Sequence, residues 1–232
     1  MMPSGLAITS WQWILDNRHT ILGYVLQHAE LTVVAVGIGL LISLPLAVWG
    51  YRRRSVYGPI TWVTGLLYTI PSIALFSLLV PITGLTFMTA EVALVSYTLL
   101  ILIRNIVTGL RGVPADVKEA ATGMGYTGSQ VLWRVEFPLA LPAIVAGVRV
   151  ATISTIGLIT IAALIGYGGL GQLILEGINR LFVTEMLVGV ILSVVLALLA
   201  DAVLLVAERL MTPWSSTRAR EIMPPRPPAM VK

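Results

Sequence analysis

The chain has 232 residues, of which 57% are hydrophobic and 11% are charged, and its mean hydropathy is +0.92. This composition excludes an ordinary soluble domain and predicts a single polytopic membrane domain. The absence of cysteine excludes disulfide scaffolds, thiolate metal sites and thiol catalysis.

The apolar stretches predict five transmembrane helices. A helix needs about 20 apolar residues to cross about 30 Å of hydrocarbon. After an external N-terminal segment, residues 1–20, we expect spans at about 21–50, 59–80, 85–103, 141–165 and 186–207. The second and third form a hairpin, because the charge-free stretch 55–90 is too long for one span and is broken at Pro81, Thr83 and Gly84. The runs lack the alternation of barrel strands. The predicted fold class is therefore all-α, a polytopic membrane helical bundle whose transmembrane domain covers residues 21–210.

The positive charges indicate how this bundle is oriented. Five spans place the termini on opposite sides, and 13 of the 15 Lys and Arg residues then lie on the side of the loop 104–138 and the tail, leaving Arg18 and Arg180 opposite. Because cytoplasmic loops collect positive charge, we expect the N-terminus outside and the C-terminus in the cytoplasm. The net charge of +4 then needs no nucleic acid as a partner. The Pro-rich cytoplasmic tail, residues 211–232, has little to bury and is expected to be disordered.

The predicted cytoplasmic loop begins its most patterned stretch with VPADVKEAATGMG, residues 113–125. Pro114 and Asp116 suit the first turn of a helix, and Gly123 and Gly125 suit a left-handed stop. We therefore expect a helix of about two turns. Helical spacing would give it one face of small and apolar residues, made of Val117, Ala120, Ala121 and Met124.

A second short helix is predicted to follow. Thr127 and Gln130 have the spacing of a capping box, and the helix would end at Phe137, before Pro138. Helices this short are marginal alone in water, so both must pack against something else.

This loop resembles the cytoplasmic loop of the permeases of bacterial ABC importers, which is written EAA, three residues, G, nine residues, I, one residue, LP. Val135 stands in place of the Ile and Phe137 in place of the Leu, and the positions that match are Glu119, Ala120, Ala121, Gly125 and Pro138. The resemblance implies that the first short helix is a coupling helix that docks on a separate ATPase. The alternative is an amphipathic helix that lies on the bilayer.

Two further stretches, YTIPSIALFSLL from Tyr68 to Leu79 and the run from Ala146 to Ile174, resemble the osmoprotectant branch of that family. The resemblance implies import of glycine betaine, choline, carnitine or a related quaternary amine across the bacterial plasma membrane. It also implies three partners: a cytoplasmic ABC ATPase, a second permease that is an identical or a sister chain, and an extracytoplasmic substrate-binding protein. Methionine permeases share the EAA loop and a GGLG loop. Another small solute such as methionine is therefore an alternative, as is a secondary transporter or channel without an ATPase.

The sequence favours no enzymatic activity and no cofactor of its own. Gly166, Gly168 and Gly171 fit GxGxxG, but the strand that a dinucleotide site requires is not predicted before them, so a turn is favoured. The phosphate-binding pattern GxxxxGK[ST] is absent, so ATP must be bound and hydrolysed by another chain. His19 and His28 are too few for a metal site.

Polar residues at membrane depth are the remaining candidates. A charge there costs about 2.5–3.5 kcal/mol on insertion scales, so Glu91, Arg149 and Asp201 should face protein or water. For Arg149 we favour snorkelling or an ion pair with the loop, and for Glu91 and Asp201 pairing between helices over contact with a substrate cation. Aromatic faces attract quaternary ammonium ions, although anchoring at the membrane interface is the alternative. The candidates for the translocation path are Tyr68, Ser72, Tyr97, Thr155 and Thr160.

Overall fold

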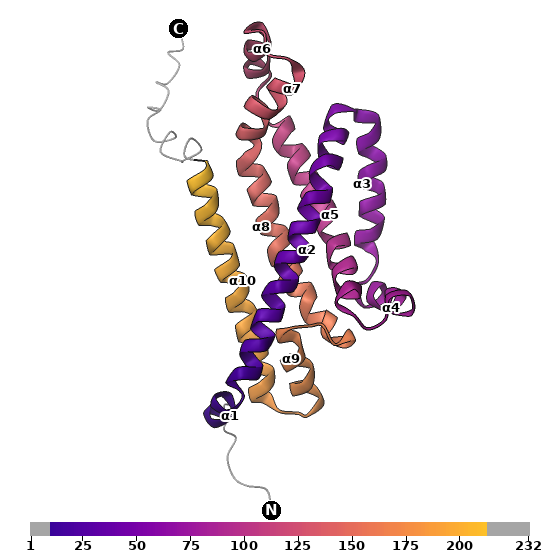
Figure 1. Ribbon diagram of the computed structural model, residues 1–232, viewed down its shortest axis with the longest axis vertical. Coiled ribbons are helices and arrows are strands. Elements are labelled where there is room, and N and C mark those ends of the chain that lie inside the picture. Colours follow the sequence, from indigo (N-terminus) through magenta and orange to yellow (C-terminus); the bar gives the residue numbers. More distant parts are fainter. Residues whose placement is uncertain (1–9, 213–232) are drawn as a thin grey trace, which may run out of the picture.

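The computed structural model describes residues 10–212, and every regular element in that range is helical (Figure 1). The all-α prediction is confirmed for this part of the chain. Residues 1–9 of the expected external segment, and residues 213–232 of the expected tail, lie outside the described range.

The elements follow one another in the order α1 (Trp11–Asp16), α2 (Arg18–Arg52), α3 (Arg54–Thr69), α4 (Ser72–Thr83), α5 (Phe87–Arg111), α6 (Ala115–Gly123), α7 (Gly128–Val131), a π-helical turn η1 (Leu132–Glu136), α8 (Phe137–Ala162), a 3-10 turn η2 (Ala163–Ile165), α9 (Leu170–Asn179) and α10 (Val183–Met211). Within the described residues, four helical runs are long and apolar enough to cross a bilayer: α2, α5, Gly128–Ile165 and α10. Helices α3 and α4 pass the same test as a pair, which gives up to five spans.

The second span is broken, whereas the sequence suggested one helix over 59–80. Helices α3 and α4 meet at an angle of 93° around Ile70 and Pro71. Proline disfavours helical geometry in the residue before it, and Ile70 is accordingly extended, with φ −65° and ψ 127°. The carbonyl of Ile70 accepts a hydrogen bond from the hydroxyl of Tyr97 on α5, which holds the corner in place. Helix α4 has 12 residues, about 18 Å, and is too short to cross a membrane alone.

The fourth span begins earlier than predicted, because the helix continues through Pro138. The expectation that a short helix ends at Phe137, with a separate span from about 141, is wrong: Gly128–Ile165 forms one helical run. At the π turn η1, the N–H of Phe137 donates to the carbonyl of Leu132, five residues back. Pro138 therefore sits in the first turn of α8, where a missing N–H is tolerated.

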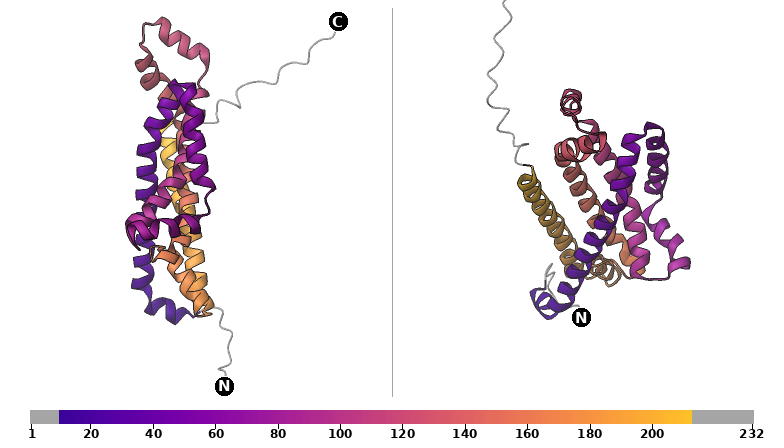
Figure 2. Two further views of the ribbon diagram at one scale, coloured as in Figure 1. Left: turned by 90° about the vertical axis from the view of Figure 1, so that its right-hand side faces the viewer. Right: turned by 45° about the horizontal axis from the view of Figure 1, so that its top comes forward.

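Helix α5 lies at the centre of the bundle and α10 at its edge. In the most apolar stretch of α5, 61% of the residues are buried, against 6% in that of α10. Helices α2 and α5 approach closely at Gly39, where an added Cβ would lie 2.0 Å from Oγ1 of Thr98. The left view of Figure 2 shows the loop that contains α6 projecting beyond the ends of the long helices. We call this the α6 end of the molecule, and the opposite one the α1 end.

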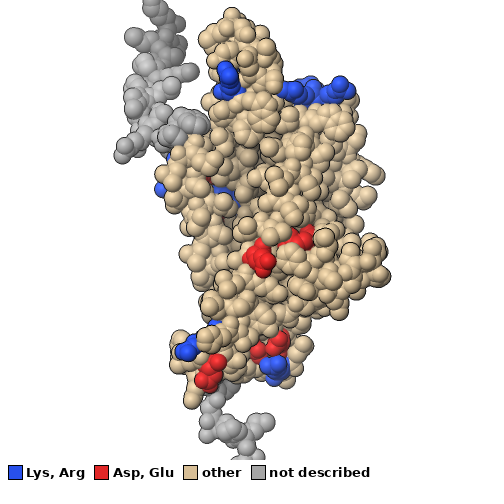
Figure 3. All heavy atoms as spheres, viewed as in Figure 1, with Lys and Arg blue, Asp and Glu red and all other residues tan. Residues whose placement is uncertain are grey.

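Charged residues gather mainly at the two ends, although Asp or Glu side chains also appear at mid-height (Figure 3). Lys and Arg side chains gather at the α6 end, over the ends of α2 and α3, while both signs of charge occur at the α1 end (Figure 3). Arg52, Arg53 and Arg54 are exposed in the turn between α2 and α3. This asymmetry matches the one that the sequence analysis used to orient the chain.

Candidate functional site

Helix α6 has the boundaries that the sequence pattern predicted. It follows Pro114, carries Asp116 in its first turn and ends before Gly125, whose φ is +87°. The N–H of Gly125 donates to the carbonyl of Thr122, and the N–H of Tyr126 to that of Ala121, which closes the last turn. Glycine is required at position 125 because a side chain is strained in this left-handed conformation.

The predicted capping box of the second short helix is confirmed. Thr127 Oγ1 accepts from the N–H of Gln130 at 3.4 Å, and the side chain of Gln130 accepts from the N–H of Thr127 at 2.8 Å. The box starts α7 and fixes the direction in which the chain returns from α6 to α8.

The residues of the EAA pattern divide between two faces of the loop. Glu119, Ala120 and Gly125 are exposed, and Met124 is 71% exposed. Ala121 is only 2% exposed and faces the rest of the loop. The expectation that Ala120 and Ala121 both offer an open surface is wrong, because Ala120 is exposed and Ala121 is buried. Pro138 is half-buried in the first turn of α8, away from that open face.

Three residues that the sequence pattern did not single out join α6 to the bundle. Lys118 Nζ lies 3.3 Å from Glu136 Oε1 and donates to the hydroxyl of Tyr51 at 2.9 Å. The same hydroxyl donates to Glu136 Oε1 at 2.8 Å. The side chains of Lys118 and Glu136 are 25% and 8% exposed, so the cluster is screened from solvent on most sides. We call these three residues the Lys118 cluster.

The charge of Lys118 is stabilised by its neighbours. Burial lowers the pKa of its ammonium group, but the hydrogen bond to Tyr51 and the charge of Glu136 together raise it by more. The pKa of Lys118 therefore lies above the usual value of 10.5, and the residue is a cation at neutral pH.

The membrane-depth charges on α8 and α10 form ion pairs with one another. Arg149 donates to Asp201 from Nε at 2.8 Å and from Nη2 at 3.0 Å, and its Nη1 lies 3.3 Å from Glu208 Oε2. Pairing between helices was the favoured interpretation of Asp201. Arg149 pairs with α10 rather than with the loop, which was one of the two interpretations favoured for it. The contacts assign this trio to helix pairing rather than to a substrate.

Glu91 is buried without a hydrogen-bonding partner in the described part of the chain. It lies in the second turn of α5 and is 4% exposed, and both of its carboxylate oxygens lack a hydrogen bond to any described residue. The pairing between helices that we favoured for Glu91 is therefore not formed among residues 10–212.

The five candidates for the translocation path are not gathered in one place. Tyr68 and Tyr97 stack edge to face with ring centroids 5.9 Å apart, beside the corner between α3 and α4. The hydroxyl of Tyr97 donates to the carbonyl of Ile70, and that of Thr160 donates to the carbonyl of Gly157. Thr155 is buried, while Tyr68 is exposed and Ser72 half-buried at the start of α4. Of the five, Tyr68 and Ser72 lie together on an accessible surface of this chain, since their helices meet at the corner.

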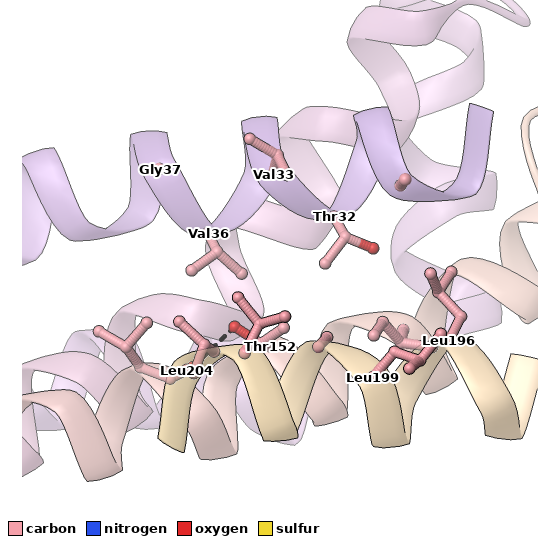
Figure 4. A pocket seen from close by; sticks show the side chains of 13 residues that line it. Thr32, Val33, Val36, Gly37, Thr152, Leu196, Leu199 and Leu204 are labelled. Carbon is pink, nitrogen blue, oxygen red and sulfur yellow. Dashed lines mark hydrogen bonds between the residues drawn. The ribbon is translucent and has the colours of Figure 1, made fainter. Parts of the chain in front are cut away.

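A groove of about 520 Å³ opens between α2, α8 and α10 (Figure 4). Its walls are apolar apart from Thr32 and Thr152, whose hydroxyls donate to the carbonyls of His28 and Val148 in their own helices. None of the five path candidates lines it. The groove thus offers a dissolved polar solute no free hydrogen-bonding side chain, and its chemistry matches the hydrocarbon of a bilayer.

The Gly-rich loop before α9 is a turn fixed by His28. The N–H of Leu170 donates to Nδ1 of His28 at 3.3 Å, and Nε2 lies 3.1 Å from the carbonyl of Ile156. Gly166 and Gly169 have positive φ angles of 83° and 50°. An added Cβ at Gly169 would lie 2.6 Å from Cβ of His28, so the loop backbone lies directly against α2. This turn is the interpretation that the sequence analysis preferred to a nucleotide site.

Comparison with known proteins places these features in context. Residues 35–213 match the family described as the binding-protein-dependent transport system inner membrane component. The chain is 37% identical over 212 residues to the choline transport system permease protein OpuBB of Bacillus subtilis, covering 91% of this chain and 97% of that protein. It is 36% identical over 197 residues to the glycine betaine/carnitine/choline transport system permease protein OpuCB of the same organism, covering 84% and 90%. A chain in the structure of inward-facing conformations of the MetNI methionine ABC transporter superposes with a TM-score of 0.73 at 24% identity, covering 83% of this chain and 96% of that one.

Proposed function

Because this chain belongs to the family of binding-protein-dependent transport system inner membrane components, we propose that it is the permease of an ATP-driven importer of quaternary amines. The expected substrates are choline, glycine betaine, carnitine or a close analogue. The observation that carries the substrate class is the identity of 36–37% to permeases named for these compounds, over most of both chains.

The α6 end is the cytoplasmic end in this proposal. It carries the exposed Arg52, Arg53 and Arg54, and positive charge accumulates on the cytoplasmic side of membrane proteins. The described N-terminal residues then lie outside the cell, and α10 delivers the C-terminus to the cytoplasm.

A separate ATPase docks on the open face of α6. Glu119, Ala120 and Gly125 are exposed there, and the small side chains allow close approach of another surface. The sequence contains no phosphate-binding loop of its own, so the partner binds and hydrolyses the ATP and this chain is not an enzyme. A substrate-binding protein delivers the solute at the α1 end.

A second permease, either an identical or a sister chain, completes the path. The groove of this chain is apolar, and its accessible path candidates, Tyr68 and Ser72, lie at the bundle surface. A polar route is therefore expected between two permeases rather than within one. Closure of the ATPase pair on ATP moves both α6 helices and opens the path outward, and hydrolysis resets the inward state.

Uptake by a reconstituted complex tests the proposal. The chain is purified with its ATPase, inserted into liposomes and supplied with the binding protein and labelled choline, glycine betaine, carnitine or methionine. We expect uptake of at least one quaternary amine that requires ATP, and that is lost when the ATPase partner carries an inactivating substitution. Uptake that is equal with and without ATP would support a secondary transporter or channel instead. ATP-driven uptake of methionine alone would overturn the substrate class but not the permease assignment.

A further inference from the structure

Helix α6 is attached to the bundle mainly through polar contacts. Of its nine residues, Ala121 is the one that is buried, so apolar packing contributes little to holding it. The helix stands beyond the ends of the long helices (Figure 2). Lys118, one turn into α6, is the residue that reaches back toward the membrane.

The ammonium group of Lys118 meets the ends of three membrane-spanning runs. It donates to the carbonyl of Leu110 at the end of α5, at 3.3 Å. It donates to Tyr51, the second-last residue of α2, and pairs with Glu136, the last residue of the π turn that leads into α8. Tyr51 and Glu136 are themselves hydrogen-bonded, so the contacts close a ring across α2, α6 and α8.

The space beside this ring is open. A groove of about 400 Å³ separates the end of α2 from the returning loop, and it is lined by Arg52, Thr122, Ser129 and Leu132, with Tyr51 and Glu136 at its edge. Beneath the groove, Leu132 packs in one apolar cluster with Ala47 and Tyr51 of α2, but no residue of α6 belongs to that cluster. A displacement of α6 itself therefore reaches α2 through the Lys118 cluster.

We propose that Lys118, Tyr51 and Glu136 are positioning residues that transmit the movement of α6 to α2 and α8. The inference rests on the proposed function, because it takes the ATPase on α6 as the source of the movement. The inference adds to the proposed function a specific set of contacts, the Lys118 cluster, that connects α6 to the bundle. None of the three residues contacts substrate or nucleotide in this proposal.

The test compares transport with ATP hydrolysis in the reconstituted complex. Lys118→Met removes the charge but keeps the length of the side chain. We expect ATP hydrolysis within about twofold of the wild-type rate, and uptake per ATP hydrolysed to fall about tenfold. Exchange of the two charges, Lys118→Glu with Glu136→Lys, restores the ion pair and should recover a large part of the lost coupling. Arg54→Met is the matched control, because it removes an exposed cation at the α6 end of the molecule. It should leave the uptake per ATP hydrolysed unchanged.

A purely structural role predicts a different pattern. Uptake and hydrolysis would then fall together with the amount of assembled complex, and the exchanged pair would restore neither or both equally. Either result overturns the proposal.

Spin labels across the groove separate this inference from the substrate assignment. Labels at Arg52 and Ser129, on opposite walls, report whether the loop and α2 move together when ATP and vanadate trap the ATPase. In the otherwise wild-type chain we expect one narrow distance distribution in both states, and in Lys118→Met a broader one after trapping. If no solute is taken up but the distribution broadens in Lys118→Met, the proposed importer function fails and the role of the Lys118 cluster is supported. If uptake is normal but the two distance distributions are alike, the role of the Lys118 cluster is refuted and the importer function is supported.

Discussion

Arg149 on α8 and Asp201 on α10 form an ion pair with two parallel hydrogen bonds, at 2.8 and 3.0 Å. Bidentate geometry of this kind fixes orientation as well as distance. Helix α10 is otherwise mostly exposed on the bundle surface, with 6% of its most apolar stretch buried. The pair is therefore the specific connection that sets how α10 meets α8 near the α6 end.

Removal of the cation alone should destabilise the bundle more than removal of all three charges. Arg149→Met leaves the carboxylates of Asp201 and Glu208 without their cation, at a depth where an unpaired charge is costly. We expect a melting temperature several degrees lower in lipid nanodiscs, and recovery of most of the loss when Arg149→Met is combined with Asp201→Leu and Glu208→Leu. Leu198→Val, an exposed apolar change on α10, is the control. A triple variant as unstable as the single one would contradict the assignment.

The buried carboxylate of Glu91 should destabilise the folded protein. Its two oxygens are buried without hydrogen bonds to the described residues, and Met has a similar length without the polar atoms. We expect Glu91→Met to raise the free energy of unfolding by about 1–3 kcal/mol. Glu91→Gln should gain less, because the amide still needs partners. The prediction fails if denaturant unfolding shows Glu91→Met to be the less stable protein.

Two glycines near the Gly-rich turn should respond in opposite directions to alanine. A Cβ at Gly171 would lie 2.5 Å from the backbone oxygen of Thr160, while at Gly157 nothing lies within 4 Å. Gly171→Ala should therefore lose about 1–3 kcal/mol through overpacking. Gly157→Ala, in the middle of α8, should gain about 0.5–1 kcal/mol. The measurement is the melting temperature of both variants in one detergent. Equal changes in melting temperature would show that the contact between Gly171 and the backbone of Thr160 can relax.

Charge reversal on the open face of α6 should remove the ATPase without unfolding the permease. Glu119 and Ala120 are both exposed, so Glu119→Lys changes the surface of α6 without disturbing buried packing. We expect the amount of ATPase that co-purifies to fall about tenfold, with an unchanged melting temperature of the permease. Arg54→Glu reverses an exposed charge in another loop at the same end and should retain the partner. Retention of the ATPase by Glu119→Lys would place the docking face elsewhere.

The attachment of α6 should depend on pH only in the alkaline range. Tyr51 and Glu136 hold the pKa of Lys118 above 10.5, so the folded state binds this proton more tightly than the unfolded chain. The stabilisation is complete below pH 10.5 and is lost as the pH rises through the higher folded value. Spin labels at Arg52 and Ser129 should report constant separation from pH 6 to 9 and loosening only at a pH above 10.5. Lys118→Met should show the looser separation throughout, with no alkaline transition.

Local patterns in the sequence predicted the local structure well. Pro114 and Gly125 specify where α6 begins and ends, and the pair Thr127 and Gln130 specifies where α7 begins, because capping and left-handed turns depend on residues within one turn of the chain. The charge-free runs predicted five spans, and within the described residues four helical runs, or five with the bent pair α3 and α4, are long and apolar enough. The corner at Pro71 was not predicted: the break was expected at Pro81, which lies inside α4, and at Thr83 and Gly84, where α4 ends.

The contacts of the Lys118 cluster could not be predicted from local patterns. Tyr51 and Lys118 are 67 residues apart, and Tyr51 and Glu136 are 85 apart, so nothing local links them. The partner of Arg149 is set by the packing of α10 on α8, 52 residues further along the chain. Ala121 was placed on the open face because the pattern shows which residues share a stripe but not which direction the stripe points.

The two hydrogen bonds of the His28 ring constrain how the α1 end of the bundle can rearrange. Since the N–H of Leu170 donates to Nδ1, the ring proton resides on Nε2 and is donated to Ile156. One uncharged imidazole thus crosslinks α2, α8 and α9, and no lone pair is left over for a metal or a solute. These three helices should shift as a rigid block during the transport cycle. In the proposed transport cycle, an opening at the α1 end must then arise at the corner before α4 or at the contact with the proposed second permease.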